Sequence, residues 1–288
     1  MATSIRNSIV VRRTIHLIMT PFLRRIRRFE GIHRGEDCYI FGDGASVKLY
    51  DLNLLCDKPG IAVGFMPRHI DFSKTDVRYW ILPEPMFFWP ALRKREYPSR
   101  KTRRLFQNFY RPQHMVDRKI VTFLNVTNFP AGLMQNTYYV FDRYPKNEKL
   151  DSVSDNVDLF AGSFNASLSL ALYLGFKRAF LIGFDYTHNP PTAGHWYEEG
   201  PGIPQDWNSY NDEFIAFINQ FIEIITVVPA PQTTKLPSIE YENLTNGSLQ
   251  YRENTALLSS DAMEVLDSIG NYRIFKSPRT LPSARLFD

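Results

Sequence analysis

The feature that constrains the fold most is a helix, a glycine and a strand in direct succession. Residues 163–174 are apolar or small on almost every side, which is typical of a buried helix, and Gly175 stands where a helix C-terminus favours glycine. Residues 178–183 then form a short apolar run that leads into Asp185 and Tyr186. This succession is half of a βαβ crossover. It predicts a parallel sheet with functional groups at the carboxyl ends of its strands.

Further apolar runs predict the rest of this sheet. The spacing of phenylalanine and isoleucine predicts a helix over residues 212–228, and residues 45–55 predict a short helix or turn. From residue 229 onward the chain is predicted to be rich in loops. Runs of β-formers predict strands at 37–41, 60–65, 79–82, 119–124 and 138–141, and an edge strand at 239–244. The fold class is therefore α/β, a Rossmann-like, mostly parallel sheet flanked by helices.

Residues 1–30 are interpreted as a basic amphipathic segment in front of one domain, residues 31–288. No acidic residue precedes Glu30, while seven arginines do. The apolar run among them is too short to span a bilayer and is interrupted by Pro21. Two interpretations stay open: residues 1–28 lie on an anionic membrane surface, or they form a helix packed on the domain. An organelle transit peptide also matches an arginine-rich start without acidic residues.

Composition excludes several classes of protein. With 44% hydrophobic and 14% aromatic residues, the chain is not a disordered one. Its two cysteines, Cys38 and Cys56, form neither a disulfide framework nor a metal site, and both lie in segments predicted to be core, which favours a reducing compartment. Residues 90–118 are basic and aromatic; this pattern suits an anionic ligand, but it is more often a solvated face, and no nucleic-acid partner is predicted.

The first candidate binding element is the turn from Gly42 to Ser46. It follows a predicted buried strand directly, and its glycines would let the backbone come close to a phosphate or ribose. Amides at the start of the next helical turn favour an anion. The turn is neither a Walker loop nor a complete dinucleotide fingerprint, and a tight turn without a ligand is the alternative. Placed after a strand, it predicts a phosphate site held by backbone amides.

The second candidate element is the segment 185–197, which follows the best-defined strand. Its prolines and glycine indicate an ordered loop, and loops at strand carboxyl ends are where binding sites are built. Its two histidines, His188 and His195, are candidate bases near neutral pH. Tyrosine hydroxyls in the same loop can donate to a departing phosphate without a metal ion. No three-ligand metal spacing stands out, so no metal site is predicted.

Three blocks of the sequence resemble one known group of enzymes. Residues 33–46, with Phe41-Gly42-Asp43-Gly44-Ala45-Ser46, followed by Leu49-Tyr50-Asp51-Leu52, are similar to the opening of the bacterial sialyltransferases of glycosyltransferase family 42 and of the related MptE-like group. Residues 171–177 with Gly183-Phe184-Asp185-Tyr186 resemble a second block of these families, and residues 243–249 a third. Their order and spacing agree, and the resemblance spans about two thirds of the chain.

This resemblance implies a GT-A-like variant of the Rossmann-like fold and metal-independent, inverting transfer of an acidic sugar from a CMP-linked donor, with no further cofactor. It implies that His195, with His188 as the rival, is the base, and that Tyr186 and Tyr197 stabilise the leaving phosphate. The residues that it implies contact the donor are Gly42, Asp43, Gly44, Ser46, Glu84, Ser163, Asn165, Asp185, Gly247 and Ser248.

The chain departs from the family pattern at three positions. Asp43 stands where the family turn usually has asparagine, and Ala45 where it has proline. Met66 takes the place of an asparagine after the second strand. A carboxylate beside a phosphate is repulsive unless it is turned onto a ribose hydroxyl, a base amine or a cation. These departures leave open a donor other than CMP-sialic acid, and we expect an acidic sugar that is sialic acid or a related nonulosonic acid or Kdo.

These observations together predict a sialyltransferase-like enzyme that builds a cell-envelope glycan such as lipopolysaccharide or capsule. We expect it in the cytoplasm, peripheral to the inner membrane, and a homo-oligomer is compatible with the sequence. One alternative is an MptE-like, magnesium-dependent pyrophosphokinase, for which Asp43 and Asp185 would supply carboxylates. A second alternative is an envelope-associated relative without catalysis, which the departures at Asp43 and Met66 motivate.

Overall fold

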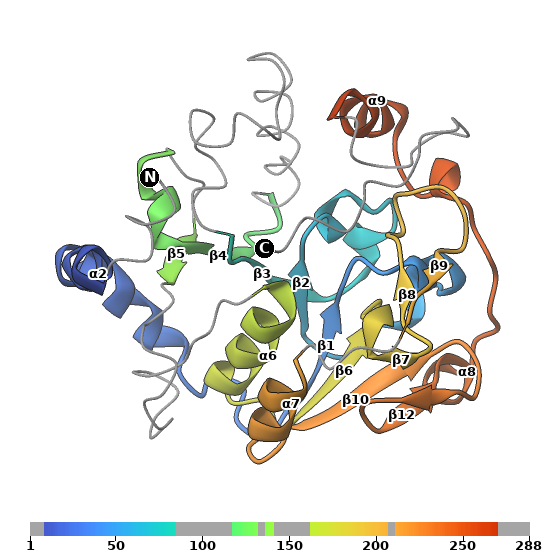
Figure 1. Ribbon diagram of the computed structural model, residues 1–288, viewed down its shortest axis with the longest axis horizontal. Coiled ribbons are helices and arrows are strands. Elements are labelled where there is room, and N and C mark those ends of the chain that lie inside the picture. Colours follow the sequence, from blue (N-terminus) through green and yellow to red (C-terminus); the bar gives the residue numbers. More distant parts are fainter. Residues whose placement is uncertain (1–8, 85–116, 132–135, 141–161, 207–210, 270–288) are drawn as a thin grey trace.

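An eight-stranded sheet, parallel throughout, forms the centre of the molecule (Figure 1). The computed structural model describes residues 9–84, 117–131, 136–140, 162–206 and 211–269. The sheet order is β12-β10-β6-β1-β2-β3-β4-β5. Its strands are β1 Asp37–Phe41, β2 Gly60–Val63, β3 Val77–Leu82, β4 Val121–Asn125, β5 Thr137–Val140, β6 Arg178–Ile182, β10 Glu223–Val228 and β12 Ser238–Glu240. The predicted Rossmann-like α/β class is confirmed.

The strand order reverses between β1 and β6. Strands β1 to β5 follow one another to one side, whereas β6, β10 and β12 extend the sheet to the other. β1 and β6 run level, because Phe41 pairs with Ile182 at their last residues. The segments that follow these two strands therefore leave the sheet side by side. In open parallel sheets this is the place where ligands bind.

The helices lie on both faces of the sheet and at its ends. The α-helices are α2 Ile9–Leu23, α6 Ser163–Leu174, α7 Asp212–Ile218, α8 Tyr241–Thr245 and α9 Ser260–Ile269. The 3₁₀ helices are η1 Arg24–Phe29, η2 Ala45–Leu49, η3 Leu52–Leu54, η4 Met66–Arg68, η5 Phe72–Lys74, η6 Val126–Ala131, η7 Asp185–Thr187 and η8 Asn254–Ala256. Two small ribbons pair β7 His188–Asn189 with β11 Thr233–Thr234, and β8 Thr192–Ala193 with β9 Ile203–Pro204.

Alternate side chains of the strands build two apolar cores, one on each face. On β1, Tyr39 and Phe41 join one cluster, while Cys38 and Ile40 join the other. Both faces are covered, so the strands carry nearly continuous apolar runs rather than an alternation. This is why the sequence predicted β1 to β6 as strands at almost the observed bounds.

The helix predicted over residues 163–174 is α6, and Gly175 ends it. Gly175 has φ 94°, in the left-handed region, and its N–H group donates to the carbonyl groups of Ala171 and Leu172. A Cβ atom here would lie 2.9 Å from Cα of Gly31. Both the backbone conformation and the close approach of Gly31 therefore require glycine.

The predicted helix over residues 212–228 is wrong in its second half. α7 ends at Ile218, and Glu223–Val228 is strand β10, paired with β6. The run Ile224-Ile225-Thr226-Val227-Val228 is rich in β-branched side chains, which suit a buried strand better than a helix. The apolar side chains of α7 and β10 fit one continuous helical spacing, so the sequence pattern did not show where the helix ends and the strand begins.

Three smaller predictions also need correction. The edge strand expected over 239–244 is only β12, because the chain turns into α8 at Tyr241. Helix α9 lies in the region predicted to be loops. Cys38 is buried as expected, but Cys56 is exposed, because it lies in the connection between η3 and β2 rather than in the core.

The described part of the N-terminal segment is a helix that packs on the edge of the sheet. Pro21 does not interrupt α2; the chain tightens into the 3₁₀ helix η1 only at Arg24. Phe22 lies against Phe129 with 4.5 Å between ring centroids, and Phe29 enters the core beside Tyr138. Packing on the domain is thus confirmed for this end of the segment. Within the described residues, no helix has the length and apolar character needed to cross a bilayer.

Candidate active site

The glycine turn after β1 lies directly against the chain that follows β6. The N–H group of Gly42 donates to the carbonyl of Ile182 at 2.7 Å, and that of Gly44 donates to the carbonyl of Gly183 at 2.8 Å. A Cβ atom on Gly44 would lie 2.6 Å from both Cγ of Asp185 and the carbonyl oxygen of Gly183. Glycine is needed here for close approach. The two predicted elements are brought together at the carboxyl edge of the sheet, as expected.

Asp185 closes the turn with its buried carboxylate. Its Oδ1 accepts from the hydroxyl of Ser46 at 2.5 Å, and its Oδ2 accepts from the N–H group of Ser46 at 2.8 Å. The amides of Gly42, Gly44 and Ser46 therefore all donate to groups of the protein itself. This differs from the amide cradle that the sequence predicted. The carboxylate of Asp185 takes the place that an anionic ligand would have at the start of η2.

Asp43 joins the turn to two neighbouring loops. Its Oδ2 accepts from the N–H group of Phe65 after β2 at 2.8 Å, and its Oδ1 accepts from Nε1–H of Trp196 at 3.1 Å. Burial raises the pKa of Asp43 to about 6, against the opposing effects of nearby His195 and of these two donors. The carboxylate that stands in place of the family's asparagine is thus turned onto protein donors, and it holds the loops together.

His195 lies beside this turn with a carboxylate on its ring. His195 pairs with Gly44 as an isolated antiparallel bridge, and its Nδ1 lies 3.0 Å from Oε2 of Glu198. The same carboxylate oxygen accepts from the backbone N–H group of His195 at 2.9 Å. The ring stacks on Tyr197, with 4.8 Å between centroids and planes 8° apart. The imidazole is therefore fixed in both position and plane.

The pairing of His195 with Glu198 sets the chemistry of the ring. A carboxylate can only accept, so Nδ1 carries the hydrogen and Nε2 is the nitrogen able to take a proton from a substrate. Burial alone would lower the pKa of His195, but the hydrogen bond and charge of Glu198, with the charges of Asp43 and Asp185, raise it above its ordinary value. The side chain is 44% exposed. A basic, oriented and accessible imidazole is what a general base needs.

His188, the rival base, lies in a different environment. It is buried at 4% exposure on β7, and its Nδ1 lies 3.5 Å from the side-chain amide of Gln232. Burial lowers the pKa of His188, against the charge of Asp185. A buried imidazole with a lowered pKa is less suited to take a proton from an incoming hydroxyl. The structure thus places the two histidines in different environments, and which of them acts as a base stays a prediction.

The two predicted tyrosines pack against different apolar cores. Tyr186 belongs to an aromatic cluster with Phe164 and Phe184, at centroid distances of 5.5 and 6.1 Å. Tyr197 is buried at 2% exposure under His195, and its ring meets Phe65 edge-on. Their predicted role toward a leaving phosphate is not tested by these contacts and stays a prediction.

The start of α6 brings the predicted residues Ser163, Asn165 and Glu84 to the same edge. The hydroxyl of Ser163 donates to Oε1 of Glu84 at 3.3 Å. Glu84 follows β3, and its nearby charge contributes to raising the pKa of Asp43. Asn165 is 7% exposed, and its Oδ1 has no hydrogen-bond donor among the described residues. A buried amide oxygen in this state is a natural acceptor for a ligand hydroxyl or amine.

Gly247 and Ser248 lie after α8, and no contact among the described residues brings them to the turn. The nearest neighbours of a Cβ atom on Gly247 would be Leu54, Thr245 and Tyr241, and Ser248 is exposed. Their role toward the donor phosphate stays a prediction. Among the described residues, no group of three or more histidine, cysteine, aspartate or glutamate side chains could hold a metal ion.

Comparisons with known proteins give likenesses of fold. No family model and no curated protein matches the chain. The MAf glycosyltransferase from Magnetospirillum magneticum AMB-1 is similar over 88% of this chain, with 13% identity and a TM-score of 0.44. This chain spans only 41% of that protein's length.

The sialyltransferase CstII from Campylobacter jejuni, solved with cytidine-5'-monophosphate, is similar over 82% of this chain and 98% of its own, with 14% identity and a TM-score of 0.42. Its structure with a trisaccharide acceptor and CMP gives 15% identity and a TM-score of 0.43 over 81% of this chain and 99% of its own. These values are too low to lend any of these proteins' activities to this chain.

Sequence reasoning missed three residues that shape the site. Glu198 stands three positions after His195, and in a tight turn this spacing brings the two side chains together. The spacing was therefore a signal from which the pair could have been predicted. Trp196 was visible as a neighbour of His195, but nothing indicated that it would bond to Asp43. Lys48 lies in the segment predicted to be a short helix or turn, and its partner Glu253 is 205 positions away. No local pattern could have paired them.

Proposed function

We propose that this chain is a glycosyltransferase that transfers an acidic sugar, sialic acid or a related nonulosonic acid or Kdo, from a CMP-linked donor to a cell-envelope glycan. The observation that carries the proposal is the His195–Glu198 pair beside Gly44, where the strand order reverses. The first two blocks of sequence that resemble the bacterial sialyltransferases meet at this point of the fold. The pair supplies the one catalytic group that an inverting transfer requires.

The proposed reaction is a single displacement. Nε2 of His195 takes the proton from an acceptor hydroxyl while its oxygen attacks the anomeric carbon of the donor sugar. A new glycosidic bond forms, the bond from the anomeric carbon to the phosphate oxygen breaks, and CMP leaves with the bonding electrons. Glu198 stabilises the imidazolium that forms, as a carboxylate does in a catalytic triad. The hydroxyls of Tyr186 and Tyr197 stabilise the leaving phosphate in this proposal.

The donor is proposed to lie over the start of α6 rather than in an amide cradle. The unsatisfied Oδ1 of Asn165 accepts from a ribose hydroxyl or from the amine of cytosine, and Ser163 and Glu84 form the adjoining wall. Asp185 and Asp43 act from within the protein by holding the turn and the loops in place. Gly42, Gly44 and Ser46 allow the close approach on which this arrangement depends.

Nucleotide binding and turnover test the proposal together. In a thermal-shift panel we expect CMP to raise the melting temperature more than UDP, GDP or ATP, with or without magnesium. With CMP-linked acidic sugars and lipid-linked acceptors, we expect CMP release that EDTA does not inhibit. A preference for ATP that needs magnesium would favour the pyrophosphokinase alternative instead. Neither CMP binding nor CMP release would reject the proposal.

The N-terminal helix is proposed to hold the enzyme against an anionic membrane surface. Leu17 and Ile18 on α2 are 75% and 65% exposed, although they are large and apolar. Four exposed arginines follow within η1: Arg24, Arg25, Arg27 and Arg28. Apolar side chains that insert into the headgroup region, next to cations that meet anionic lipids, are typical of interfacial helices. The acceptor, a lipid-linked glycan, would be presented at this surface.

Vesicle sedimentation tests the membrane proposal. Because Phe22 and Phe29 pack on the domain, deleting the whole segment would also damage the fold. The better variant is therefore Leu17→Ser with Ile18→Ser, which removes only exposed apolar groups. We expect it to lose binding to phosphatidylglycerol vesicles while keeping its melting temperature. Ile70→Ser, at an exposed isoleucine before η5, is the matched control. Equal binding by the double variant and the control would reject the proposal.

A further inference from the structure

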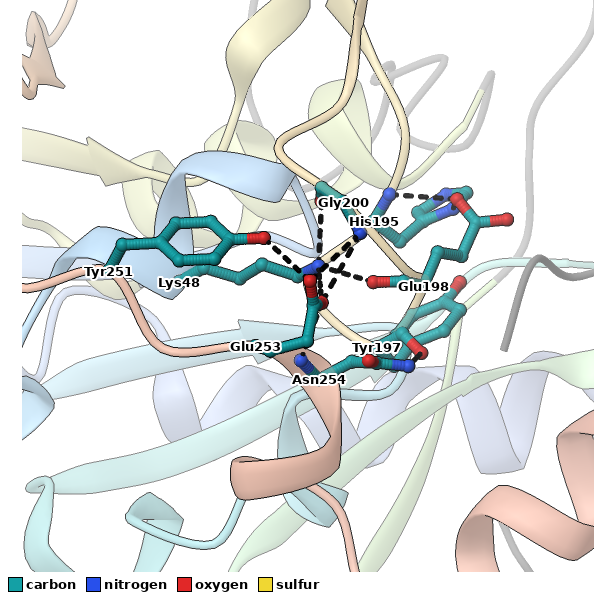
Figure 2. A network of polar contacts seen from close by, with 8 residues as sticks. All are labelled: Lys48, His195, Tyr197, Glu198, Gly200, Tyr251, Glu253 and Asn254. Carbon is teal, nitrogen blue, oxygen red and sulfur yellow. Dashed lines mark hydrogen bonds and ion pairs between the residues drawn. The ribbon is translucent and has the colours of Figure 1, made fainter. Parts of the chain in front are cut away.

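A fully buried lysine lies behind the loop that carries His195. Lys48, on η2, has a side chain that is 0% exposed, and its ammonium group is surrounded by acceptors from two other segments (Figure 2). It donates to the carbonyl groups of Glu198 and Gly200, the second at 2.7 Å, and to Oε1 of Glu253 at 2.7 Å. An ammonium group has three hydrogens, so these three acceptors use all of them.

Glu253 fixes the ammonium from the other side. Its carboxylate also accepts from the N–H group of Gly200 at 3.2 Å and from the hydroxyl of Tyr251 at 2.9 Å. Burial would raise the pKa of Glu253, but the hydrogen bond from Lys48, with those from Asn254 and Tyr251 and the charge of Lys48, lowers it to about 2. The carboxylate is therefore ionised at neutral pH. Lys48 and Glu253 form a charged pair with further hydrogen bonds on both members.

The network holds the backbone of the loop 197–200 at several successive points. Besides the carbonyls of Glu198 and Gly200, the carbonyl of Tyr197 accepts from the side-chain amide of Asn254 at 3.1 Å. Figure 2 shows these contacts on one side of the loop and the ring of His195 on the other. Glu198 links the two sides: its carbonyl is bound by Lys48, while its carboxylate is bound to His195.

We propose that Lys48, fixed by Glu253, is a positioning residue that holds the loop 195–200 so that Glu198 stays on the ring of His195. A buried ammonium is costly, and an apolar side chain often replaces a buried ion pair without loss of stability. The ammonium group of Lys48 supplies three directed hydrogen bonds here, and two of them go to backbone carbonyl groups of the loop 195–200. Without them the carbonyl of Glu198 can shift, and its carboxylate shifts with it. The proposal rests on the function proposed above only in calling His195 the base.

The test measures His195 directly by a nuclear magnetic resonance titration of its ring, with the His195→Ala spectrum used to assign the signal. The variants are Lys48→Met, Glu253→Gln and the two combined. Lys235→Met is the control, because the side chain of Lys235 is also buried, at 4% exposure, and also pairs with a carboxylate, Asp212, at 2.7 Å. Far-ultraviolet circular dichroism and melting temperature establish that each variant is folded.

We expect Lys48→Met to lower the pKa of His195 toward its ordinary value, because the charge and hydrogen bond of Glu198 are loosened. If His195 is the base, kcat rises with pH as the ring loses its proton. With a lower pKa of His195, this rise should occur at lower pH. kcat should fall by ~10- to 100-fold, as misplaced catalytic groups do, with KM nearly unchanged. The double variant should shift no further than Lys48→Met, because the pair acts as one unit. Lys235→Met should leave His195 unchanged.

An unchanged ring titration in folded Lys48→Met would overturn the proposal, and so would an equal shift in Lys235→Met. If Lys48→Met does not fold, Glu253→Gln decides in its place: it keeps an acceptor for the ammonium but removes the charge, so a smaller shift in the same direction is expected and no shift overturns the idea. The titration needs no substrate. Absence of turnover in the unaltered protein would therefore reject the proposed function and leave the positioning role to be judged on the titration alone.

Discussion

The turn at residues 42–46 and the loop at residues 195–200 lie against each other, but they use their polar groups in opposite ways. In the turn, the amides of Gly42, Gly44 and Ser46 all donate to the protein, and the acceptor of the Ser46 amide is the buried carboxylate of Asp185. In the loop, the backbone is bound from behind by Lys48, while the imidazole of His195 is 44% exposed. The polar groups of the turn that are named here are bound within the protein, whereas the loop leaves the imidazole of His195 accessible to solvent.

The difference indicates that the two regions have separate tasks. The turn carries the sequence pattern that is most similar to a known nucleotide site, yet its contacts are those of a structural support. The loop carries a weaker pattern, yet it holds His195, the proposed base, with its ring oriented by Glu198. Substitutions in the turn should therefore act first on stability, and substitutions in the loop should act first on chemistry. The following predictions test this division.

The largest effect is expected at His195. His195→Ala should lower kcat by ~10³-fold, about 4 kcal/mol of transition-state stabilisation, because a positioned general base contributes on this scale. The melting temperature should change little, since the ring is partly exposed. His188→Ala is the control: its buried ring should affect stability and leave kcat within about threefold. A large loss of kcat in His188→Ala, with little loss in His195→Ala, would assign the base to His188 and contradict the division between the turn and the loop.

A smaller effect, on stability alone, is expected at Gly44. Gly44→Ala places a Cβ atom 2.6 Å from Cγ of Asp185 and the carbonyl of Gly183, so we expect a loss of about 3 kcal/mol in the free energy of unfolding. Gly35→Ala is the control. Gly35 has φ +83° but nothing within 4 Å of a Cβ atom, so only backbone strain of about 1 kcal/mol is expected. Urea unfolding measures both; equal losses would show that the turn is not crowded.

The smallest effect is expected in the pH dependence contributed by Asp43. Its pKa is raised to about 6 from 3.8, so the folded protein binds this proton more tightly than the unfolded chain. The stabilisation is fully present below about pH 4 and is lost as the pH rises to about 6, on the order of 2 kcal/mol. In Asp43→Asn this part of the pH dependence should disappear. Urea unfolding at several pH values between 4 and 7 measures it, and identical slopes in both proteins would contradict it.

Much of the fold was predictable because its strongest signals are local. β1 and β6 are buried on both faces, so their sequences are short continuous apolar runs, and Gly175 marks the end of α6 at the residue itself. The boundary between α7 and β10 was missed because the helix and the strand share one apolar spacing. There the β-branched side chains after Glu223 were the signal to follow. Helix α9 was missed because its segment lies within a tail that is otherwise rich in turns.

The site was predictable only in part, for a physical reason. Topology alone brings residues 42–46 and 185–197 to one edge, and the sequence predicted this correctly. The partners of each group were not predictable, because they depend on contacts between distant segments. Asp43 was expected to face a ligand and instead accepts from Phe65 and Trp196. The amides of Gly42, Gly44 and Ser46 were expected to be available to a ligand, and instead they donate to the protein itself.

The pairing of Lys48 with Glu253 has a consequence for the order of events during synthesis. Lys48 leaves the ribosome before the residue that neutralises it, which follows 205 positions later. Until Glu253 is present, the ammonium group of Lys48 lacks the carboxylate that pairs with it in the folded protein. Contacts between positions so far apart in the sequence also form slowly. The loop 195–200 can therefore reach its final geometry only after the segment that carries Glu253 has been translated. A nascent polypeptide stalled just before Glu253 would already contain every strand of the described sheet, while the backbone of the loop 195–200 would lack this support.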